Sequence, residues 1–413
     1  MMTRKFHDLT LPLLGFGAMR LPLLADGSGH VDEARTRDMV AYAMQHGLNY
    51  FDTAYPYHGG ESERIMGRIL ADYPRESYLL ATKFPSHVAA AGRTPASIFE
   101  EQLEKCRVSY FDFYLLHNVC ETTTPTFCDP KLGIVDYLLE QRRLGRIRYL
   151  GFSSHGQMDN LRAFLDLYGK EMAFCQIQLN YLDWTFQKAK EKYELLTSLG
   201  IPVWVMEPVR GGRLARLDES EAAALRALNP DLSPSAWAFR FVKDLPNVHM
   251  VLSGMSNMEQ LRENIETFSH PQPLTPAERE ALLSLAERMK NTVPCTACRY
   301  CVDGCPAGLD IPMLLAAYNA FRLSASEAAR RKTALGLRGL RPVREGLSAG
   351  HRRARASESL CRGAGAPFPV RAHASRVRRS LHILILCKRA VFGIMMRHCR
   401  IYRPYPSKGG AWP

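Results

Sequence analysis

The chain has 413 residues, of which 46% are apolar, enough for one large domain and a smaller appendage. Its formal net charge of +13 comes from residues 347–413, which contain 14 Lys and Arg but a single acid, Glu358. The preceding 346 residues contain 40 basic and 40 acidic residues. A body without net charge argues against a nucleic-acid-binding protein, because such proteins need a basic surface.

The N-terminal stretch MMTRKFHDLT lacks an apolar core and does not predict a secretory signal. The longest apolar run near the end, residues 381–396, is interrupted by Lys388 and Arg389 and is too short to predict a transmembrane segment. A segment lying on a membrane surface is the less favoured alternative. Four of the eleven cysteines form one metal-type run, which favours a reducing, cytoplasmic setting over a disulfide framework.

Eight apolar, β-branched or aromatic runs predict strands along the first 255 residues. They are residues 11–19, 48–55, 78–84, 111–118, 147–154, 174–181, 201–208 and 248–255. Segments with helical spacing lie between them, including residues 32–47, 95–110 and 133–145. Eight strands alternating with helices over this length predict an α/β fold, a (β/α)8 TIM barrel. A doubly wound open sheet is the alternative, but no Gly-x-Gly-x-x-Gly follows the first strand.

Polar side chains stand at or just after the ends of three consecutive predicted strands. Asp52, Lys83 and His117 end the second, third and fourth strands, and Tyr57 follows the second. Each of them alone has a structural reading, such as a helix cap or a surface charge. Because the carboxyl ends of barrel strands meet at one rim, we expect the four to share a catalytic site.

This set of groups suits the reduction of a carbonyl. A tyrosine can protonate the oxygen, and a nearby ammonium lowers the pKa of a phenol toward neutral pH. An aspartate can hold the lysine in place, and an imidazole can orient the substrate oxygen. The sequence therefore predicts a site for proton delivery beside a hydride donor.

The chain resembles the aldo-keto reductase family. The stretches that carry the resemblance are FDTAYPYHGGESE, ATKFP, LLHN, LGFSSH, CQIQLNY and GMSNMEQLRENI, and it covers roughly residues 8–290. It implies that Tyr57 is the general acid, Lys83 the modulator of its pKa, Asp52 the partner of the lysine and His117 the group that orients a small carbonyl substrate.

The resemblance also implies NADP or NAD as cofactor, with the preference between them open. At the carboxamide end it implies contacts from Ser153, Ser154 and Gln176, while Met206 or Glu207 stands where the family often has an aromatic residue. The residues implied at the adenine end are Gly254, Ser256, Gln260, Glu263 and Asn264. Gly254 and Gln260 stand at the usually basic positions for the 2′-phosphate, and Arg262 or Arg213 is the predicted substitute.

The run CTACRYCVDGCP, residues 295–306, predicts a 4Fe–4S cluster held by Cys295, Cys298, Cys301 and Cys305. A zinc site or idle thiols are the alternatives. The run resembles the first half of the ferredoxin-like extension that some aldo-keto reductases carry, and its second cysteine run is missing. Cys305 suits the second cluster of such a pair, so we expect the first cluster to be incomplete, labile or lost.

The second cysteine run is expected around residues 349–362, and the composition changes abruptly at about the same place, from residue 347 onward. One hypothesis is that residues 347–413 are translated in a shifted reading frame. The rival is a genuine disordered basic tail that binds acidic partners. We thus expect three regions: a reductase-like barrel over residues 1–290, a partial iron–sulfur segment of helical character over residues 291–346, and a basic tail of low order over residues 347–413.

Three functions fit these features. The favoured one is an NAD(P)H-dependent reductase of an aldehyde or ketone that carries an iron–sulfur appendage. The first alternative is a redox sensor or regulatory module that binds the nicotinamide cofactor with little turnover. The second is an electron-transfer protein, in which the cluster passes electrons between the nicotinamide and a protein partner.

Overall fold

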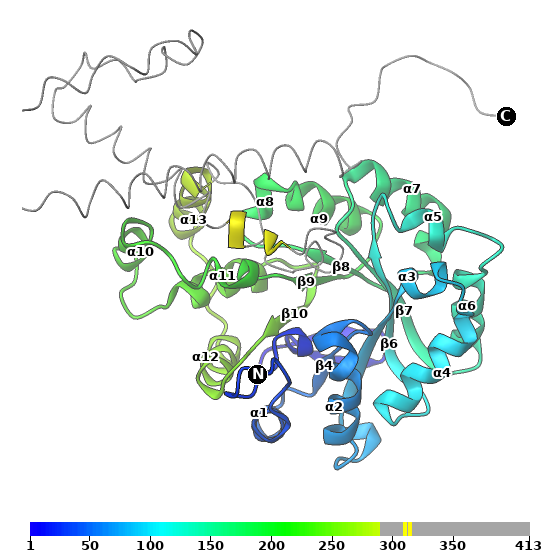
Figure 1. The fold of residues 1–413 in the computed structure, drawn as a ribbon. Coiled ribbons are helices and arrows are strands. Elements are labelled where there is room, and N and C mark those ends of the chain that lie inside the picture. The colour runs from blue at the N-terminus through cyan, green and yellow to red at the C-terminus, as the bar shows by residue number, and fades with distance from the viewer. Residues whose placement is uncertain (290–308, 312, 316–413) are drawn as a thin grey trace, which may run out of the picture. The chain divides into compact units, whose positions relative to one another are not determined.

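The computed structural model describes residues 1–289, 309–311 and 313–315 (Figure 1). The chain divides into two compact units, Met1–Cys298 and Arg299–Pro413. The four cysteines of the predicted cluster and the whole of residues 347–413 lie outside the described residues, as does most of the segment 291–346. The predictions for these regions therefore stay predictions.

The first unit is a closed barrel of parallel strands in the order β10-β3-β4-β5-β6-β7-β8-β9, surrounded by helices (Figure 1). Its strands are β3 (Leu14–Gly17), β4 (Tyr50–Asp52), β5 (Leu79–Phe84), β6 (Phe111–Val119), β7 (Ile147–Ser154), β8 (Cys175–Gln178), β9 (Val203–Met206) and β10 (Val248–Gly254). Each lies within one of the predicted runs or extends it by a single residue. The predicted (β/α)8 barrel is confirmed, and the open sheet is excluded because β10 pairs with both β3 and β9.

The first predicted strand, residues 11–19, is wrong in its extent. Its beginning belongs to β2 (Leu9–Pro12), which forms an antiparallel hairpin with β1 (Thr3–Phe6), and only β3 joins the barrel. Leu11, Leu13 and Leu14 are all fully buried, so the two strands read as one apolar run. The hairpin brings Phe6 against Trp204 at a ring-centroid distance of 4.9 Å, at the amino-terminal end of the barrel.

The α-helices follow the strands in the expected alternation. They are α1 (Glu33–Gln45), α2 (Glu61–Leu70), α3 (Ser86–Ala90), α4 (Pro95–Cys106), α5 (Thr124–Phe127), α6 (Ile134–Arg143), α7 (Met158–Tyr168), α8 (Asp183–Phe186), α9 (Ala189–Ser198), α10 (Glu219–Arg226), α11 (Pro234–Lys243), α12 (Met258–Ser269) and α13 (Pro276–Met289). The 3-10 turns are η1 (Ala18–Arg20), η2 (Tyr57–Gly60), η3 (Arg75–Ser77), η4 (Gly169–Glu171) and η5 (Arg210–Gly212). The three helices expected at residues 32–47, 95–110 and 133–145 correspond to α1, α4 and α6.

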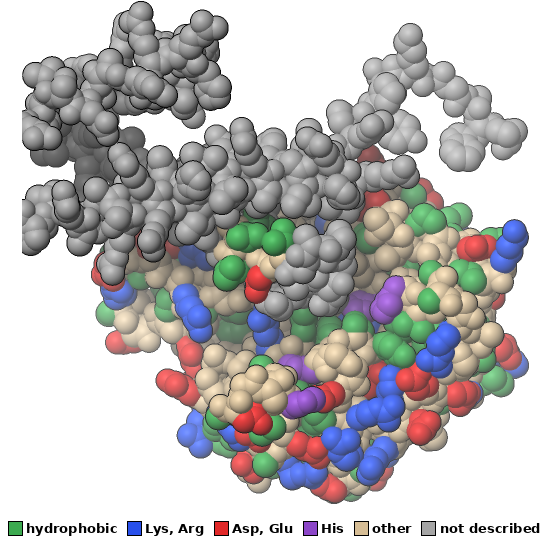
Figure 2. Space-filling model, in the orientation of Figure 1, with side chains coloured by type: hydrophobic (Ala, Val, Ile, Leu, Met, Phe, Trp, Pro, Cys, Tyr) green, Lys and Arg blue, Asp and Glu red, His purple; other side chains and the backbone are tan. Residues whose placement is uncertain are grey.

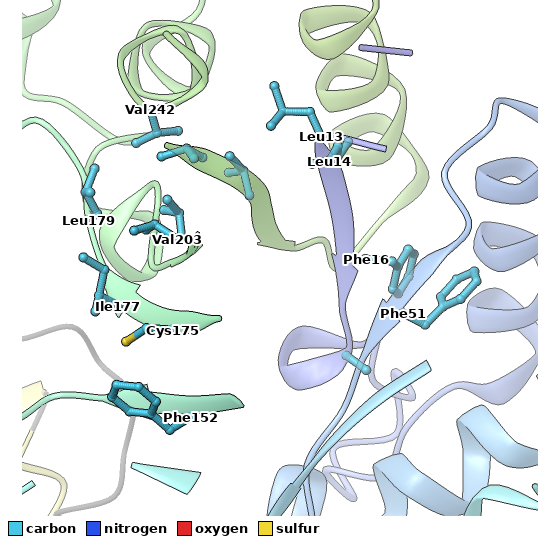
Figure 3. Close-up of a cluster of buried hydrophobic side chains, with 14 of the residues drawn as sticks. Leu13, Leu14, Phe16, Phe51, Phe152, Cys175, Ile177, Leu179, Val203 and Val242 are labelled. Atoms are coloured by element: carbon cyan, nitrogen blue, oxygen red, sulfur yellow. The ribbon is translucent and has the colours of Figure 1, made fainter. Parts of the chain in front are cut away.

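Two hydrophobic clusters hold the barrel. The larger lies between strands and helices and includes Phe16, Phe51, Phe152 and Ile177 (Figure 3). The smaller fills the barrel interior and is built from Phe6, Tyr50, Phe113, Phe174, Trp204 and their neighbours. A Cβ on Gly151 would lie 2.5 Å from the Phe174 ring, so glycine is needed there for the ring to fit. Because aromatic rings fill the amino-terminal half, polar side chains are left at the carboxyl ends of the strands.

Acidic and basic side chains are interspersed on the visible surface of the barrel (Figure 2), in keeping with its balanced charge. In the part of the chain that the structure describes, no helix has both the length and the apolar character needed to cross a membrane.

Candidate active site

Asp52 and Lys83 form a buried ion pair at the carboxyl end of the barrel. Asp52 ends β4 and pairs in register with Ala81 of β5, so Lys83, two residues further on, points to the same inner face. The Lys83 Nζ lies 2.6 Å from Asp52 Oδ1 and donates to the Thr53 carbonyl at 2.8 Å. Asp52 Oδ2 is buried without a hydrogen-bond partner among the described residues.

Tyr57 and His117 complete the group. Tyr57 opens η2, directly after β4, and its side chain is 9% exposed. Lys83 Nζ is 4.9 Å from the centre of the Tyr57 ring. The rings of Tyr57 and His117 meet edge to face with centroids 6.1 Å apart. The fold thus brings all four predicted residues together from β4, η2, β5 and β6.

Burial sets the charges of this group. It raises the pKa of Asp52, and the Lys83 ammonium opposes that rise. Burial also lowers the pKa of His117 well below its ordinary value, helped by the positive charge of Lys83 and by His155 and His87. His117 is therefore a neutral imidazole near neutral pH, able to donate or accept a hydrogen bond. Figure 2 shows histidine side chains (purple) at two separate places on the visible face of the barrel.

A buried polar network, which we did not predict from the sequence, contacts the backbone of Lys83. Glu63 of α2 is fully buried, and its Oε1 accepts hydrogen bonds from Thr82 and from Gln102 of α4, both at 2.6 Å. Gln102 also donates to the Lys83 carbonyl at 3.1 Å and accepts from the hydroxyl of Tyr114 at 2.5 Å. The signal in the sequence was a Glu and a Gln on the inner faces of two otherwise amphipathic helices, beside the strand that ends in Lys83.

The two serines implied at the carboxamide end differ in what their hydroxyls do. Ser153 Oγ accepts from the Asn118 backbone N–H at 2.8 Å, which leaves its own proton for another acceptor. Ser154 Oγ donates to the Val119 carbonyl at 2.9 Å and so ties β7 to β6. Ser153 keeps a free donor function, whereas Ser154 acts mainly on the backbone.

Gln176 lies in register with Ser153 across β7 and β8. Its Nε2 contacts Met206 Sδ at 3.6 Å, and its Oε1 is buried with no partner in residues 1–289, 309–311 and 313–315. Asn118 Oδ1 is likewise buried and has no hydrogen-bond partner among the described residues. Two buried acceptors without partners beside Ser153 fit a ligand that donates N–H groups, such as a carboxamide.

The residues implied at the phosphate end surround the start of α12. Gly254 ends β10, and a Cβ there would lie 2.7 Å from the Arg20 side chain. Ser256 donates its hydroxyl to the Arg20 carbonyl at 2.9 Å, and Gln260 Oε1 accepts from the Ser256 N–H at 2.8 Å. Asn257 caps α12 by accepting from the Gln260 N–H. These hydrogen bonds hold the turn before α12 in place.

Glu263 and Asn264 both make bonds inside the fold. Glu263 Oε1 accepts from the hydroxyls of Ser233 and Ser235 at the start of α11. Asn264 Nδ2 donates to Ser253 Oγ of β10 at 3.0 Å. These contacts fix α12 against α11 and β10, and so shape the end of the site implied for adenine.

The two arginines predicted as substitutes for the missing 2′-phosphate ligands have other contacts. Arg213 Nη2 binds both carboxylate oxygens of Glu221, at 2.7 and 2.9 Å. The guanidinium of Arg262 lies over the Tyr42 ring, 5.3 Å from its centre. The basic residue that packs against Gly254 is Arg20, through the aliphatic part of its side chain.

A second buried ion pair, absent from the sequence prediction, lies in the loops after β8 and β9. Arg210 Nε is 3.1 Å from both carboxylate oxygens of Asp183, and Gln178 and Asn180 each donate to Asp183 Oδ2 at 2.7 Å. Arg210 Nη2 is buried with no partner in the described part of the chain. Only the fold could reveal this pair, because its members are 27 residues apart in two loops.

The described residues offer no group of three or more His, Cys, Asp or Glu side chains suited to a metal ion. The described cysteines, Cys106, Cys120, Cys128 and Cys175, are free thiols. The four cysteines predicted to bind a cluster lie outside these ranges.

Comparison with known proteins places this geometry in a family. Residues 13–287 match the family model described as the Aldo/keto reductase family. The NADH-specific methylglyoxal reductase of Escherichia coli is 29% identical over 224 residues, covering 50% of this chain and 66% of that protein. The probable aldo-keto reductase 1 of Glycine max is 27% identical, over 48% of this chain and 56% of that protein. The chain thus spans roughly six tenths of the length of these two relatives.

Solved structures show the same fold. An aldo-keto reductase from Bacillus halodurans in its holo form is 26% identical, covers 69% of this chain and 96% of its own, and gives a TM-score of 0.56. An aldo/keto reductase from Klebsiella pneumoniae in complex with NADP and acetate is 20% identical, covers 69% of this chain and 95% of its own, and also gives 0.56. At that lower identity the second likeness concerns the fold alone.

Proposed function

Because the chain belongs to the aldo/keto reductase family, we propose that it is an oxidoreductase that reduces an aldehyde or a ketone with NADH or NADPH, with Tyr57 as proton donor. The observation that carries the proposal is the contact of the Tyr57 ring with Lys83 Nζ and with the neutral ring of His117. A phenol whose ring lies beside both an ammonium and an imidazole at a barrel mouth suits proton delivery to a carbonyl oxygen.

Each of the four residues has a distinct role in this proposal. The Lys83 ammonium stabilises the phenolate that Tyr57 becomes when it gives up its proton. Asp52 holds Lys83 Nζ at 2.6 Å and balances its charge in a buried site. The neutral His117 donates a hydrogen bond to the substrate oxygen and aligns the carbonyl carbon.

The residues at the mouth fit a nicotinamide cofactor. The unpartnered acceptors Gln176 Oε1 and Asn118 Oδ1, within the described ranges, suit the N–H groups of a carboxamide, and Ser153 has a proton to donate. When bound, the cofactor supplies the hydride. We further propose that Ser154 and Met206 line this end, and that the turn formed by Gly254, Ser256, Gln260, Glu263 and Asn264 receives the adenosine end.

The test is steady consumption of NADH or NADPH, followed by absorbance, with a panel of small aldehydes and ketones. The panel includes methylglyoxal, because a relative is named for its reduction. Tyr57→Phe should lose at least about a hundredfold in kcat, the lower end of the range for a general acid. Tyr55→Phe is the matched control, because Tyr55 is a neighbouring tyrosine whose hydroxyl contacts Glu101 instead of the site.

If both nucleotides bind but no carbonyl in the panel is reduced, the chain acts as the sensor considered above, and the reductase proposal is wrong. If Tyr57→Phe keeps the activity of the unaltered protein, Tyr57 is not the proton donor. A comparison of dissociation constants for NADH and NADPH, repeated with Arg20→Gln, measures how much Arg20, whose side chain packs against Gly254, contributes to binding of the 2′-phosphate.

We also propose that Cys295, Cys298 and Cys301 bind iron through their thiolates, with Cys305 as the fourth cysteine of the run. The support is the spacing in the sequence. Iron and acid-labile sulfide per chain, measured after reconstitution without oxygen, test it. About four irons support a cluster, while absence of iron means that the appendage is inactive. The genomic reading frame beyond residue 347 decides between a frame shift and a genuine basic tail.

A further inference from the structure

Glu207 is held in an unusual conformation directly after β9. Its φ of 58° lies in the left-handed region, which a side chain other than glycine adopts at a cost. Its carbonyl accepts from Asn180 Nδ2 at 3.0 Å and from the Arg210 N–H at 2.9 Å. These two hydrogen bonds to one carbonyl hold the backbone of Glu207 in place, and with it the direction in which the side chain leaves the backbone.

The carboxyl group of Glu207 has few contacts for a buried acid. The residue as a whole is partly exposed, yet its Oε2 is buried and has no hydrogen-bond partner within the described ranges. A backbone N–H of Gly211 faces the carboxylate. Burying a carboxylate without full hydrogen bonding costs free energy. This position therefore favours the neutral acid, or a ligand that supplies the missing contact.

The charged groups around Glu207 come from three elements. The positive charges of Arg20 of η1 and Arg210 of η5 stabilise the ionised carboxylate and lower its pKa, whereas the negative charge of Asp183 of α8 raises that pKa. The Arg210 charge is shared with Asp183, which it contacts at 3.1 Å. Burial outweighs these charges and raises the pKa of Glu207 to about 7. The free protein therefore holds both forms near neutral pH.

The position of Glu207 lies between the two ends of the proposed cofactor site. On one side its neighbour Met206 contacts Gln176 at the carboxamide end. On the other side β9 pairs with β10, whose last residue, Gly254, packs against Arg20. A dinucleotide that joins these ends places its diphosphate, with two negative charges, in the stretch that includes Glu207.

We propose that Glu207 is a further cofactor-binding residue that admits the dinucleotide only as the neutral carboxylic acid, so that binding takes up one proton. This inference rests on the proposed function. The ionised carboxylate would repel the diphosphate inside a site of low dielectric constant, whereas the acid offers an O–H donor. The bound state is then the protein with a protonated Glu207 plus the dinucleotide, formed from the carboxylate, one proton and the free dinucleotide.

The experiment is a fluorescence titration of NADH, and in parallel of NADPH, from pH 5.5 to 9. It uses the full chain, Glu207→Gln and the control Glu121→Gln, an exposed glutamate that contacts the Gln157 N–H. We expect the unaltered chain and the control to lose about tenfold in affinity for each pH unit above pH 7, since one proton is bound per dinucleotide. Glu207→Gln should bind as tightly at pH 8.5 as at pH 6.

Calorimetry at pH 8.5 in two buffers of different ionisation enthalpy gives a second readout. It should show uptake of about one proton in the unaltered chain and none in Glu207→Gln. Binding with the same pH slope in Glu207→Gln, or no slope in the unaltered chain, overturns this inference and leaves the proposed function intact. No binding of either dinucleotide at any pH overturns both.

Discussion

Lys83 Nζ and Asp52 Oδ1 lie 2.6 Å apart inside the barrel, and both side chains are almost completely buried. The cost of removing two charges from water is offset by their attraction and by the bond from Lys83 to the Thr53 carbonyl. Such a pair is sensitive to the loss of one partner, because the remaining charge is then buried alone.

The first prediction concerns this pair. Asp52→Ala should lower the free energy of unfolding by about 3–5 kcal/mol, because Lys83 loses its counter-charge. The double variant Asp52→Ala with Lys83→Met should recover part of that loss, since no buried charge remains. Urea denaturation of the three proteins measures the difference. A double variant as unstable as the single one would show that the ion pair does not control stability here.

The second prediction concerns the network behind Lys83. Glu63→Ala should lower the free energy of unfolding by about 2–4 kcal/mol, because Thr82 and Gln102 lose their buried acceptor. It should also reduce kcat, since Gln102 contacts the Lys83 carbonyl. The control Glu104→Ala, at an exposed site on α4, should change stability by less than about 0.5 kcal/mol. If Glu63→Ala and Glu104→Ala lowered the thermal unfolding temperature equally, the network around Glu63 would not be important for stability.

The third prediction uses the neutral state of His117. Because burial holds its pKa well below the ordinary value, kcat/KM should show no titration of this imidazole between pH 6 and 8. His117→Gln keeps a neutral hydrogen-bond donor and should retain more activity than His117→Ala, which we expect to lose about 100-fold. The test is a pH profile for each variant, and a step near pH 6.5 that disappears in His117→Gln would show that the ring is charged in the free enzyme.

The fourth prediction concerns the pH dependence of stability in the absence of cofactor. The pKa of Glu207 is raised from 4.5 to about 7 in the folded chain, so the unfolded chain gives up this proton first as pH rises. Its contribution to stability is therefore present below pH 4.5 and is lost as the pH rises toward 7. The difference corresponds to roughly 3 kcal/mol.

Glu207→Gln removes this effect and supplies the measurement. The free energy of unfolding of the unaltered chain, relative to that of Glu207→Gln, should fall by about 3 kcal/mol between pH 4.5 and pH 8. Chemical denaturation of both proteins at these two pH values measures the difference. A constant difference between the two proteins would show that Glu207 has its ordinary pKa.

The barrel itself was predictable from the order of residues. Parallel strands covered on both faces read as apolar runs, and glycines such as Gly47, Gly145 and Gly200 mark the turns that precede three of them. Because the carboxyl ends of barrel strands meet at one rim, the sequence alone predicts that Asp52, Tyr57, Lys83 and His117 lie close together. Their catalytic roles stay predictions until the variants are measured.

Contacts between residues far apart in the sequence could be seen only in the tertiary structure. Leu11 and Leu14 belong to different strands although they are equally buried, because Thr3 and Arg4 pair with the strand that contains Leu11. Arg213 was a candidate for phosphate until Glu221 was seen to bind it. Glu207 and Arg210 read as ordinary loop charges, yet each has a buried atom without a partner in the described residues.

The sequence by itself thus determined the barrel and the residue types at its mouth, because local periodicity fixes which faces of strands and helices are buried. Only the tertiary structure decided which charges meet, as with Arg210 and Asp183, and which buried atoms lack a hydrogen-bond partner among the described residues, as with Oε2 of Glu207. The physical reason is that pairing and desolvation depend on segments far apart in the chain, whose meeting is a property of the closed barrel and not of any local pattern.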